Sequence, residues 1–158
     1  MRSHSLPGLV FIIMIVLNGA VVAEVASFAR QAEDSSVFTT DTTLLTKSDS
    51  LFNNLHLGKL GLGRVAYDYA MLGYYVLRKK GKLKNENVLT IADMSTPSRN
   101  KRLFVIDMKN EKLLFVTYVA HGKNSGLDKT LFFSNKPESN MSSVGFYITL
   151  GTYYGLHG

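Results

Sequence analysis

The clearest pattern in the chain is a pair of apolar runs separated by a short polar segment. Residues 103–107 and 113–119 are rich in Leu, Phe, Val and Ile, while residues 108–112 between them are polar, with Asn110 suited to a turn. This pattern predicts a β-hairpin. Both alternating sets of positions are apolar in each run, so we expect both strands near the middle of a sheet that is covered on both faces.

An amphipathic helix is predicted over residues 64–80. Its apolar positions recur at helical spacing and are Val65, Tyr69, Leu72 and Val76. Gly73 lies on the same stripe and would let a neighbouring backbone come close. Gly81 follows the last turn and suits the residue after a helix C-terminus. We expect this helix to pack on the sheet as a support.

The remaining apolar segments predict two further strands and a short helix. Residues 88–93 and 144–150 are β-rich runs, and Gly145 suggests a bulge or a close backbone approach. Residues 51–57 predict a short helix with Ser48 or Ser50 as its N-cap. Residues 131–133 are expected to form a short strand or a packed loop.

The first 50 residues differ from the rest of the chain. Arg2, the uncharged apolar run Leu9–Leu17 and the small residues at 21–23 are typical of a secretory signal peptide, with an uncleaved membrane anchor as the alternative. Residues 31–50 are rich in Ser, Thr and Asp, and residues 24–50 are interpreted as a flexible linker. The sequence therefore predicts a signal peptide over 1–23, a linker over 24–50 and one domain over 51–158.

Composition and charge narrow the candidate chemistry. The 158 residues contain no cysteine, so they offer no disulfide, thiolate metal site or thiol nucleophile. The formal net charge is +6, and basic residues cluster at 78–84 and 99–102. In an exported protein these clusters suit anionic wall polymers or lipid head groups, or they are simply a solvated helix end and two turns. The four histidines show no metal-ligand spacing, so we expect no metal or other cofactor, and we expect no nucleic-acid partner.

A small polar loop follows the second strand of the predicted hairpin. Residues 120–126 read Ala-His-Gly-Lys-Asn-Ser-Gly, and the hydrophobic pattern stops there. A rigid strand that ends in such a loop is a common way to place a binding site. His121 is a candidate hydrogen-bonding group for a substrate, and the alternative is a structural histidine that fixes the loop.

Several motifs in order along the chain resemble the murein L,D-transpeptidase catalytic-domain family. They are Arg-Leu-Phe-Val-Ile-Asp at 102–107, Val-Ala-His-Gly-Lys-Asn-Ser-Gly at 119–126, Phe-Ser-Asn-Lys-Pro at 133–137, Ser-Ser-Val-Gly-Phe-Tyr-Ile-Thr at 142–149 and Thr-Tyr-Tyr-Gly-Leu-His-Gly at 152–158. The resemblance covers roughly residues 50–158. It implies an α+β fold in which N-terminal helices pack on a mixed, mostly antiparallel β-sheet, incomplete at the C-terminus.

The resemblance also implies a function in the bacterial envelope. The family cross-links or remodels peptidoglycan through a cysteine acyl-enzyme, and its cysteine motif would lie further along than residue 158. We therefore expect a chain that lacks the nucleophile, is inactive on its own and is marginally stable or prone to aggregation. The alternative functions are a non-catalytic cell-wall-binding envelope protein and, less specifically, a basic envelope adaptor.

The implied partners and site follow from the same resemblance. The partner would be a peptidoglycan stem peptide, with membrane contact only through the signal peptide before cleavage, and the location would be the periplasm or cell envelope. The oligomeric state stays open. No catalytic residue is assigned, and the expected substrate-binding residues are His121, Gly122, Asn124, Ser125, Tyr154 and His157.

Overall fold

The structure is a computed structural model, and it describes residues 10–14 and 42–149. Its elements are β1 (Val10–Met14), α2 (Thr42–Asn54), α3 (Arg64–Lys79), β2 (Val88–Asp93), β3 (Leu103–Asp107), β4 (Lys112–Thr117), the 3-10 turn η1 (Lys123–Ser125) and β5 (Gly145–Ile148). Strands 88–93 and 103–107 were predicted with these bounds, and the helix predicted over 64–80 ends one residue earlier. The expected α+β class is confirmed.

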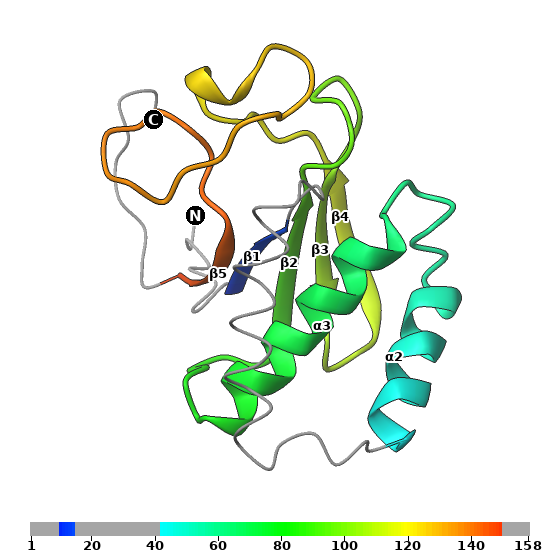
Figure 1. Cartoon of the computed structure of the whole chain (residues 1–158). Helices are drawn as coiled ribbons and strands as arrows, with labels where there is room; N and C mark the ends of the chain where they lie inside the picture. Colours follow the sequence, from blue (N-terminus) through cyan, green and yellow to red (C-terminus); the bar gives the residue numbers. More distant parts are fainter. Residues whose placement is uncertain (1–9, 15–41, 150–158) are drawn as a thin grey trace, which may run out of the picture.

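The strands form one mixed sheet in the order β4-β3-β2-β1-β5. The β3–β4 pair is the predicted hairpin, and β2–β3 and β1–β5 are also antiparallel. Only the β1–β2 pair among these strands is parallel. The expectation of a mixed, mostly antiparallel sheet is therefore correct (Figure 1).

The hydrophobic core lies between α3 and the central strands. Tyr67 and Ala70 of α3 have no exposed surface, and they belong to one cluster with Leu89 of β2 and Phe104 of β3. Each large side chain that leaves water in this way contributes about 1.5–3 kcal/mol to folding. Figure 1 shows α3 lying along the sheet, with α2 beside it. The helix thus supports the sheet as expected, but the predicted stripe is not its buried face, because Val65 is 47% exposed.

Helix α2 begins earlier than the sequence suggested. It starts at Thr42, so the prediction of a linker through residue 50 is wrong for residues 42–50, and neither Ser48 nor Ser50 is an N-cap. The Ser-, Thr- and Asp-rich composition hid this helix. Contacts with α3 explain its presence, because helices of ordinary propensity are stabilised mainly by packing.

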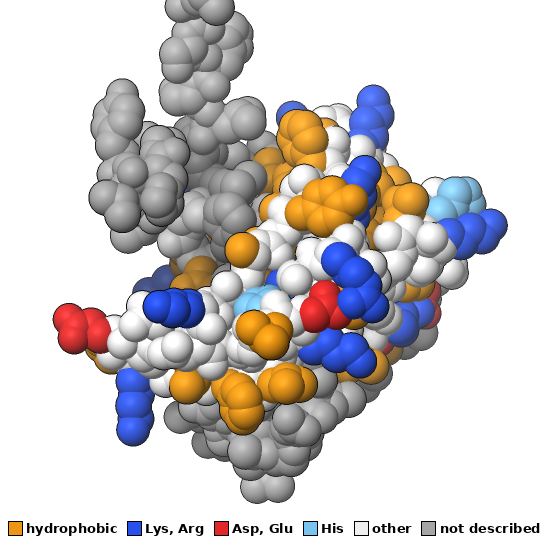
Figure 2. All heavy atoms as spheres, turned by 90° about the horizontal axis from the view of Figure 1, so that it is seen from above, with side chains coloured by type: hydrophobic (Ala, Val, Ile, Leu, Met, Phe, Trp, Pro, Cys, Tyr) orange, Lys and Arg blue, Asp and Glu red, His pale blue; other side chains and the backbone are white. Residues whose placement is uncertain are grey.

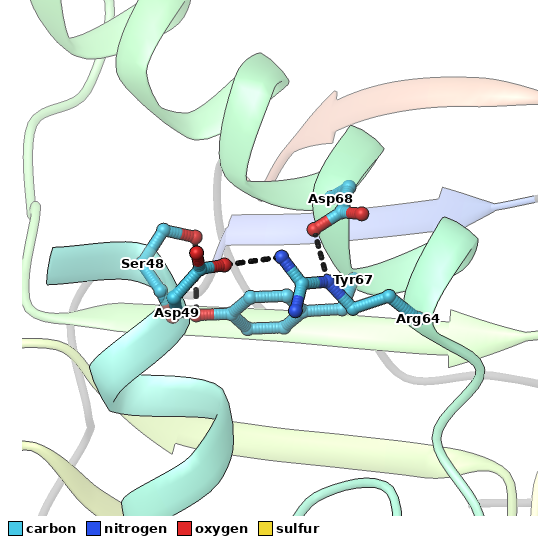
Figure 3. Close-up of polar contacts among 5 residues, drawn as sticks. All are labelled: Ser48, Asp49, Arg64, Tyr67 and Asp68. Atoms are coloured by element: carbon cyan, nitrogen blue, oxygen red, sulfur yellow. Dashed lines mark hydrogen bonds and ion pairs between the residues drawn. The ribbon is translucent and has the colours of Figure 1, made fainter. Parts of the chain in front are cut away.

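Polar contacts join α2 to α3. The hydroxyl of Tyr67 donates a hydrogen bond to the carbonyl oxygen of Ser48 at 2.8 Å. Arg64 pairs with Asp49 of α2 and, through Nε at 2.7 Å, with Asp68 one turn along α3 (Figure 3). The charged groups lie at the surface, whereas Tyr67 is fully buried, so the tyrosine provides the buried part of this junction.

The prediction that both hairpin strands are covered on both faces is wrong for the second. Phe104, Val105 and Ile106 in the middle of β3 are buried, because β2 and β4 flank this strand. Strand β4 is at the edge of the sheet, and its Leu114 and Phe115 are 43% and 61% exposed. The sequence pattern did not distinguish a central strand from an apolar edge strand.

Two glycine predictions have different outcomes. Gly81 has φ = +62°, the left-handed conformation expected just after a helix. Gly73 does receive a close neighbour, but the neighbour is the ring of Phe146 on β5 and not a backbone. The residues 131–133, left open between a strand and a loop, contribute only an isolated bridge between Phe133 and Ser142.

Strand β1 comes from the apolar run that the sequence assigned to a signal peptide. Val10–Met14 lies between β2 and β5, a position that needs an apolar, β-branched segment. The rest of the predicted signal peptide and residues 24–41 of the predicted linker lie outside the described residues. Among the residues that the structure describes, no helix is both long enough and apolar enough to cross a bilayer.

Candidate functional site

The loops that follow β2 and β4 meet at one end of the sheet. Both strands run antiparallel to β3, which lies between them, so their C-terminal ends lie at the same end of the sheet as the start of β3. Residues 94–102 and 118–131 are therefore brought together, and Figure 1 shows these loops above the strands. This end of the sheet contains the polar loop that the sequence singled out.

Arg102 lies at the centre of these loops. Its side chain has no exposed surface. Nε and Nη2 donate to the carbonyl oxygen of Val119 at 3.1 and 3.0 Å, and Nη1 donates to the carbonyl oxygen of Thr96 at 2.8 Å. Nη1 also donates to Oγ1 of Thr130 at 3.3 Å, and Nη2 lies 2.9 Å from Nδ1 of His121. One guanidinium thus contacts both loops.

The ring of His121 uses both nitrogens inside the protein. Nδ1 faces the guanidinium of Arg102, and Nε2 lies 3.1 Å from the carbonyl oxygen of Gly126. This geometry matches the second of the two roles weighed for His121, a histidine that fixes its loop. Contact of the ring with a substrate stays a prediction.

A second network ties the loop to residues 139–142. The amide of Gly122 donates to Oγ of Ser142 at 2.8 Å, and the amide of Ser142 donates to Oγ of Ser125 at 2.7 Å. The amide of Asn124 donates to the carbonyl oxygen of Asn140 at 2.9 Å. A side chain at Gly122 would meet the backbone of residues 140–142, so only glycine fits there without a shift. The loop is thus held from two sides.

The structure brings four of the six predicted site residues together. One loop contains His121, Gly122, Asn124 and Ser125. Ser125 is fully buried, and its Oγ accepts the hydrogen bond from the amide of Ser142. Asn124 is exposed, and its side-chain amide donates to the carbonyl oxygen of Ser139 at 2.9 Å. Tyr154 and His157 lie outside the described residues.

Two charged residues in this region were not predicted as part of the site. Asp93 ends β2 fully buried, where Oδ2 accepts from the amide of Gly63 at 2.8 Å and Oδ1 accepts from the amide of Ser95 at 3.0 Å. Arg102 precedes β3, and burial lowers its pKa while Asp93 and Asp128 act in the opposite direction. The sequence held no signal for either residue, since a charged side chain beside an apolar run is usually exposed.

The outer surface of this end is both apolar and basic. Figure 2 looks onto it and shows hydrophobic side chains interspersed with Lys and Arg. Tyr118, Leu127 and Phe132 in these loops are 59%, 98% and 59% exposed. Arg99 is paired with Asp128. The described ranges contain no group of three or more His, Asp or Glu side chains that could hold a metal ion.

Comparisons with known proteins identify the domain. Residues 59–158 match the family described as the L,D-transpeptidase catalytic domain, which is more than half of the chain. No curated protein and no solved structure matches the chain. The matched range includes α3, β2–β5 and the loops around Arg102. The family acts on peptidoglycan and is typically found in the periplasm or cell envelope. The chain belongs to the L,D-transpeptidase catalytic-domain family.

Proposed function

We propose that this chain recognises peptidoglycan stem peptides in the bacterial envelope, at the loop end of its sheet. The observation that carries the proposal is the family match over residues 59–158, which includes a histidine loop held in place by partly buried hydrogen bonds. A preorganised loop of this kind loses little conformational entropy when it binds a peptide. The function is therefore assigned to the site and not to the fold alone.

The proposed binding surface has an inner and an outer part. His121 and Ser125 hold the loop from inside, while Gly122 and Asn124 form the wall that a stem peptide would contact. Exposed apolar side chains such as Leu127 offer contact area, and the Lys and Arg side chains on the same face (Figure 2) complement the carboxylates of a stem peptide. Tyr154 and His157 are proposed as the rim of the same site.

The chemistry of the family needs a group that these residues do not include. Acyl transfer would use a cysteine thiolate to attack a stem-peptide carbonyl, and the sequence contains no cysteine. We assign this chain scaffold and recognition roles, with peptidoglycan cross-linking or remodelling as the role of the complete protein. Reading the coding DNA beyond codon 158 in all frames would test this assignment. A following open frame with a histidine-glycine pair and a cysteine motif would support it.

Retention on purified sacculi tests recognition directly. The 158-residue chain should bind sacculi, survive washing with moderate salt and be released by soluble stem peptides. Asn124→Ala should weaken retention several-fold, because it removes an exposed amide from the proposed wall. The matched control is Lys80→Ala, since Lys80 is exposed just after the C-terminus of α3.

The same assay separates the alternative functions. Release by salt but not by stem peptides would indicate attraction of a basic protein to an anionic polymer, which is the general adaptor function. No retention would remove wall recognition. We also propose export to the envelope, which cell fractionation tests. Because Val10–Met14 forms β1 of the sheet, the exported chain should keep these residues, and sequencing of its N-terminus checks this. Recovery in the cytosolic fraction would contradict export.

A further inference from the structure

The hydrogen bonds of Arg102 account for every N–H of its guanidinium. A guanidinium has five N–H donors and no acceptor. The structure pairs them with the carbonyl oxygen of Val119 twice, the carbonyl oxygen of Thr96, the hydroxyl of Thr130 and the ring of His121. We propose that Arg102 is the positioning residue of this site, which fixes the position of the His121 loop and holds His121 in a single tautomer.

The burial of this charge makes the contacts cooperative. Arg102 has no exposed surface, so an N–H that lost its acceptor could not turn to water. Leaving a buried donor without a partner is costly, and more so when the donor is charged. Movement of either loop would therefore leave part of the cation without partners. The position of each loop depends on the other through this one side chain.

The partners of the guanidinium are neutral, which sets this arrangement apart from an ordinary ion pair. Asp93 and Asp128 influence Arg102 electrostatically, but both carboxylates are bound elsewhere. Asp93 accepts hydrogen bonds from Gly63 and Ser95, and Asp128 is paired with Arg99. The positive charge is thus stabilised mainly by dipoles of the loops themselves. Those dipoles are the groups that must stay in place for the site to keep its shape.

The side chain that can do this is specifically arginine. Its planar fork places donors in several fixed directions, whereas a lysine ammonium has three donors at one point. Lysine at position 102 could keep the charge but could not reach the acceptors in both loops at once. The carbonyl oxygen of Val119 would lose its paired contact with Nε and Nη2. Arg102→Lys therefore separates the charge from the geometry.

The tautomer of His121 follows from the same contacts. Arg102 can only donate, so Nδ1 of His121 must accept, and the carbonyl oxygen of Gly126 can only accept, so Nε2 must donate. The hydrogen bonds assign the Nε2–H form. Without the guanidinium, Nδ1 could carry the proton. Nε2 would then have no hydrogen to donate to the carbonyl oxygen of Gly126.

Nuclear magnetic resonance of the uniformly ¹⁵N-labelled full chain tests the proposal. Long-range ¹H–¹⁵N correlations of the histidine rings distinguish a protonated from an unprotonated ring nitrogen, and His121→Gln assigns the signal. The parent chain should show an unprotonated Nδ1 and a protonated Nε2 at position 121. Arg102→Lys should convert this pattern to a mixture of tautomers and shift the amide signals of residues 119–130, with the amide signals of β2 little changed.

Two comparisons keep the result interpretable. Lys101→Met removes a neighbouring exposed cation and should leave the His121 pattern unchanged. If Arg102→Lys fails to fold, Thr130→Val removes a single acceptor of Nη1 and should shift the loop amides without unfolding the chain. An Nδ1–H tautomer in the parent chain would overturn the proposal. Unchanged ring and loop signals in a folded Arg102→Lys chain would also overturn it.

The proposal rests on the proposed function only for the use of the loop as a binding wall. The tautomer and the loop signals need no peptidoglycan, whereas sacculus retention needs no particular tautomer. A confirmed Nε2–H tautomer with no sacculus retention would reject the binding role and keep the positioning role. Retention on sacculi with an Nδ1–H tautomer would keep the binding role and reject the positioning role.

Discussion

Replacing Tyr67 with phenylalanine tests the packing of α2 on α3. The ring of Tyr67 is fully buried and lies 4.9 Å from the ring of Phe52, measured between centroids. Its hydroxyl donates to the carbonyl oxygen of Ser48 at 2.8 Å and accepts from the Ser48 hydroxyl at 3.4 Å (Figure 3). Phenylalanine keeps the ring and loses these bonds. A typical net hydrogen bond contributes roughly 1 kcal/mol, so Tyr67→Phe should lower the free energy of unfolding by about 1 kcal/mol at pH 8.

The pH dependence gives the sharper result. Burial raises the pKa of Tyr67 from its ordinary value of 10.0 to about 12, although the hydrogen bond with Ser48 opposes this effect. Between these values the unfolded chain loses the tyrosine proton while the folded chain keeps it. The unfolded state then binds fewer protons, so stability falls as pH rises from about 10 to about 12. At about 1.36 kcal/mol per pKa unit the loss is at most roughly 2.7 kcal/mol.

Phenylalanine has no proton to lose, so the stability curves of the two chains should cross. Tyr67→Phe should be the less stable chain at pH 8. At pH 12 it should be the more stable chain by about 1 to 2 kcal/mol, and the two curves should cross at about pH 11. Urea unfolding followed by far-ultraviolet circular dichroism from pH 8 to 12 measures the difference between the chains. Taking this difference removes the shared titration of lysines and other groups.

The matched control is Tyr118→Phe. Tyr118 is 59% exposed, so this replacement should change the free energy of unfolding by less than about 0.5 kcal/mol at neutral pH. A stability difference between Tyr67→Phe and the parent that stays constant from pH 8 to 12 would refute the reasoning. So would a Tyr67→Phe chain that is more stable than the parent at pH 8.

Three further changes test the core, the loop and the sheet. Phe104→Ala should lower the free energy of unfolding by about 3–5 kcal/mol because Phe104 is fully buried. Leu127→Ala, at a side chain that is 98% exposed, should change it by less than about 0.5 kcal/mol. Equal effects of the two changes in urea unfolding would contradict the placement of Phe104 in the core. Gly126→Ala should cost about 1–3 kcal/mol and shift the loop amide signals, because φ is +135° and the new methyl group would meet the carbonyl oxygen of Lys129; unchanged stability would contradict this loop geometry. Deleting residues 1–14 removes β1 and leaves β2 and β5 without their shared partner, so size-exclusion chromatography should show aggregation; a monomer with a cooperative melt would contradict the place of β1 in the sheet.

Local patterns were enough to predict several elements, and their limits have physical causes. The bounds of β2 and α3 were predicted closely because β-branched runs and helical periodicity are local signals. The buried face of α3 was not, because apolar residues such as Val65 also lie on its exposed side. Helix α2 was missed in part because Ser, Thr and Asp favour loops until a partner such as α3 is present. The burial of β4 was overestimated because apolar composition does not reveal that a strand lies at the edge of a sheet.

The candidate site was predictable as a loop but not as a network. The change from apolar to small polar residues at position 120 located the loop, and the resemblance named its residues. Arg102 and Asp93 were missed because their roles depend on partners elsewhere in the chain, such as Val119 and Gly63. A charged residue beside a strand looks the same in sequence whether it faces water or closes a buried network.

The sequence by itself determined the family, the α+β class and the loop that follows β4, because each follows from local patterns of neighbouring residues. Only the tertiary structure decided that β1 separates β2 from β5, that β4 is an edge strand and that Arg102 joins two loops. The physical reason is that strand order and the burial of a charge arise from contacts between distant segments. A single guanidinium with five hydrogen bonds to four neutral acceptors exists only after those segments have met.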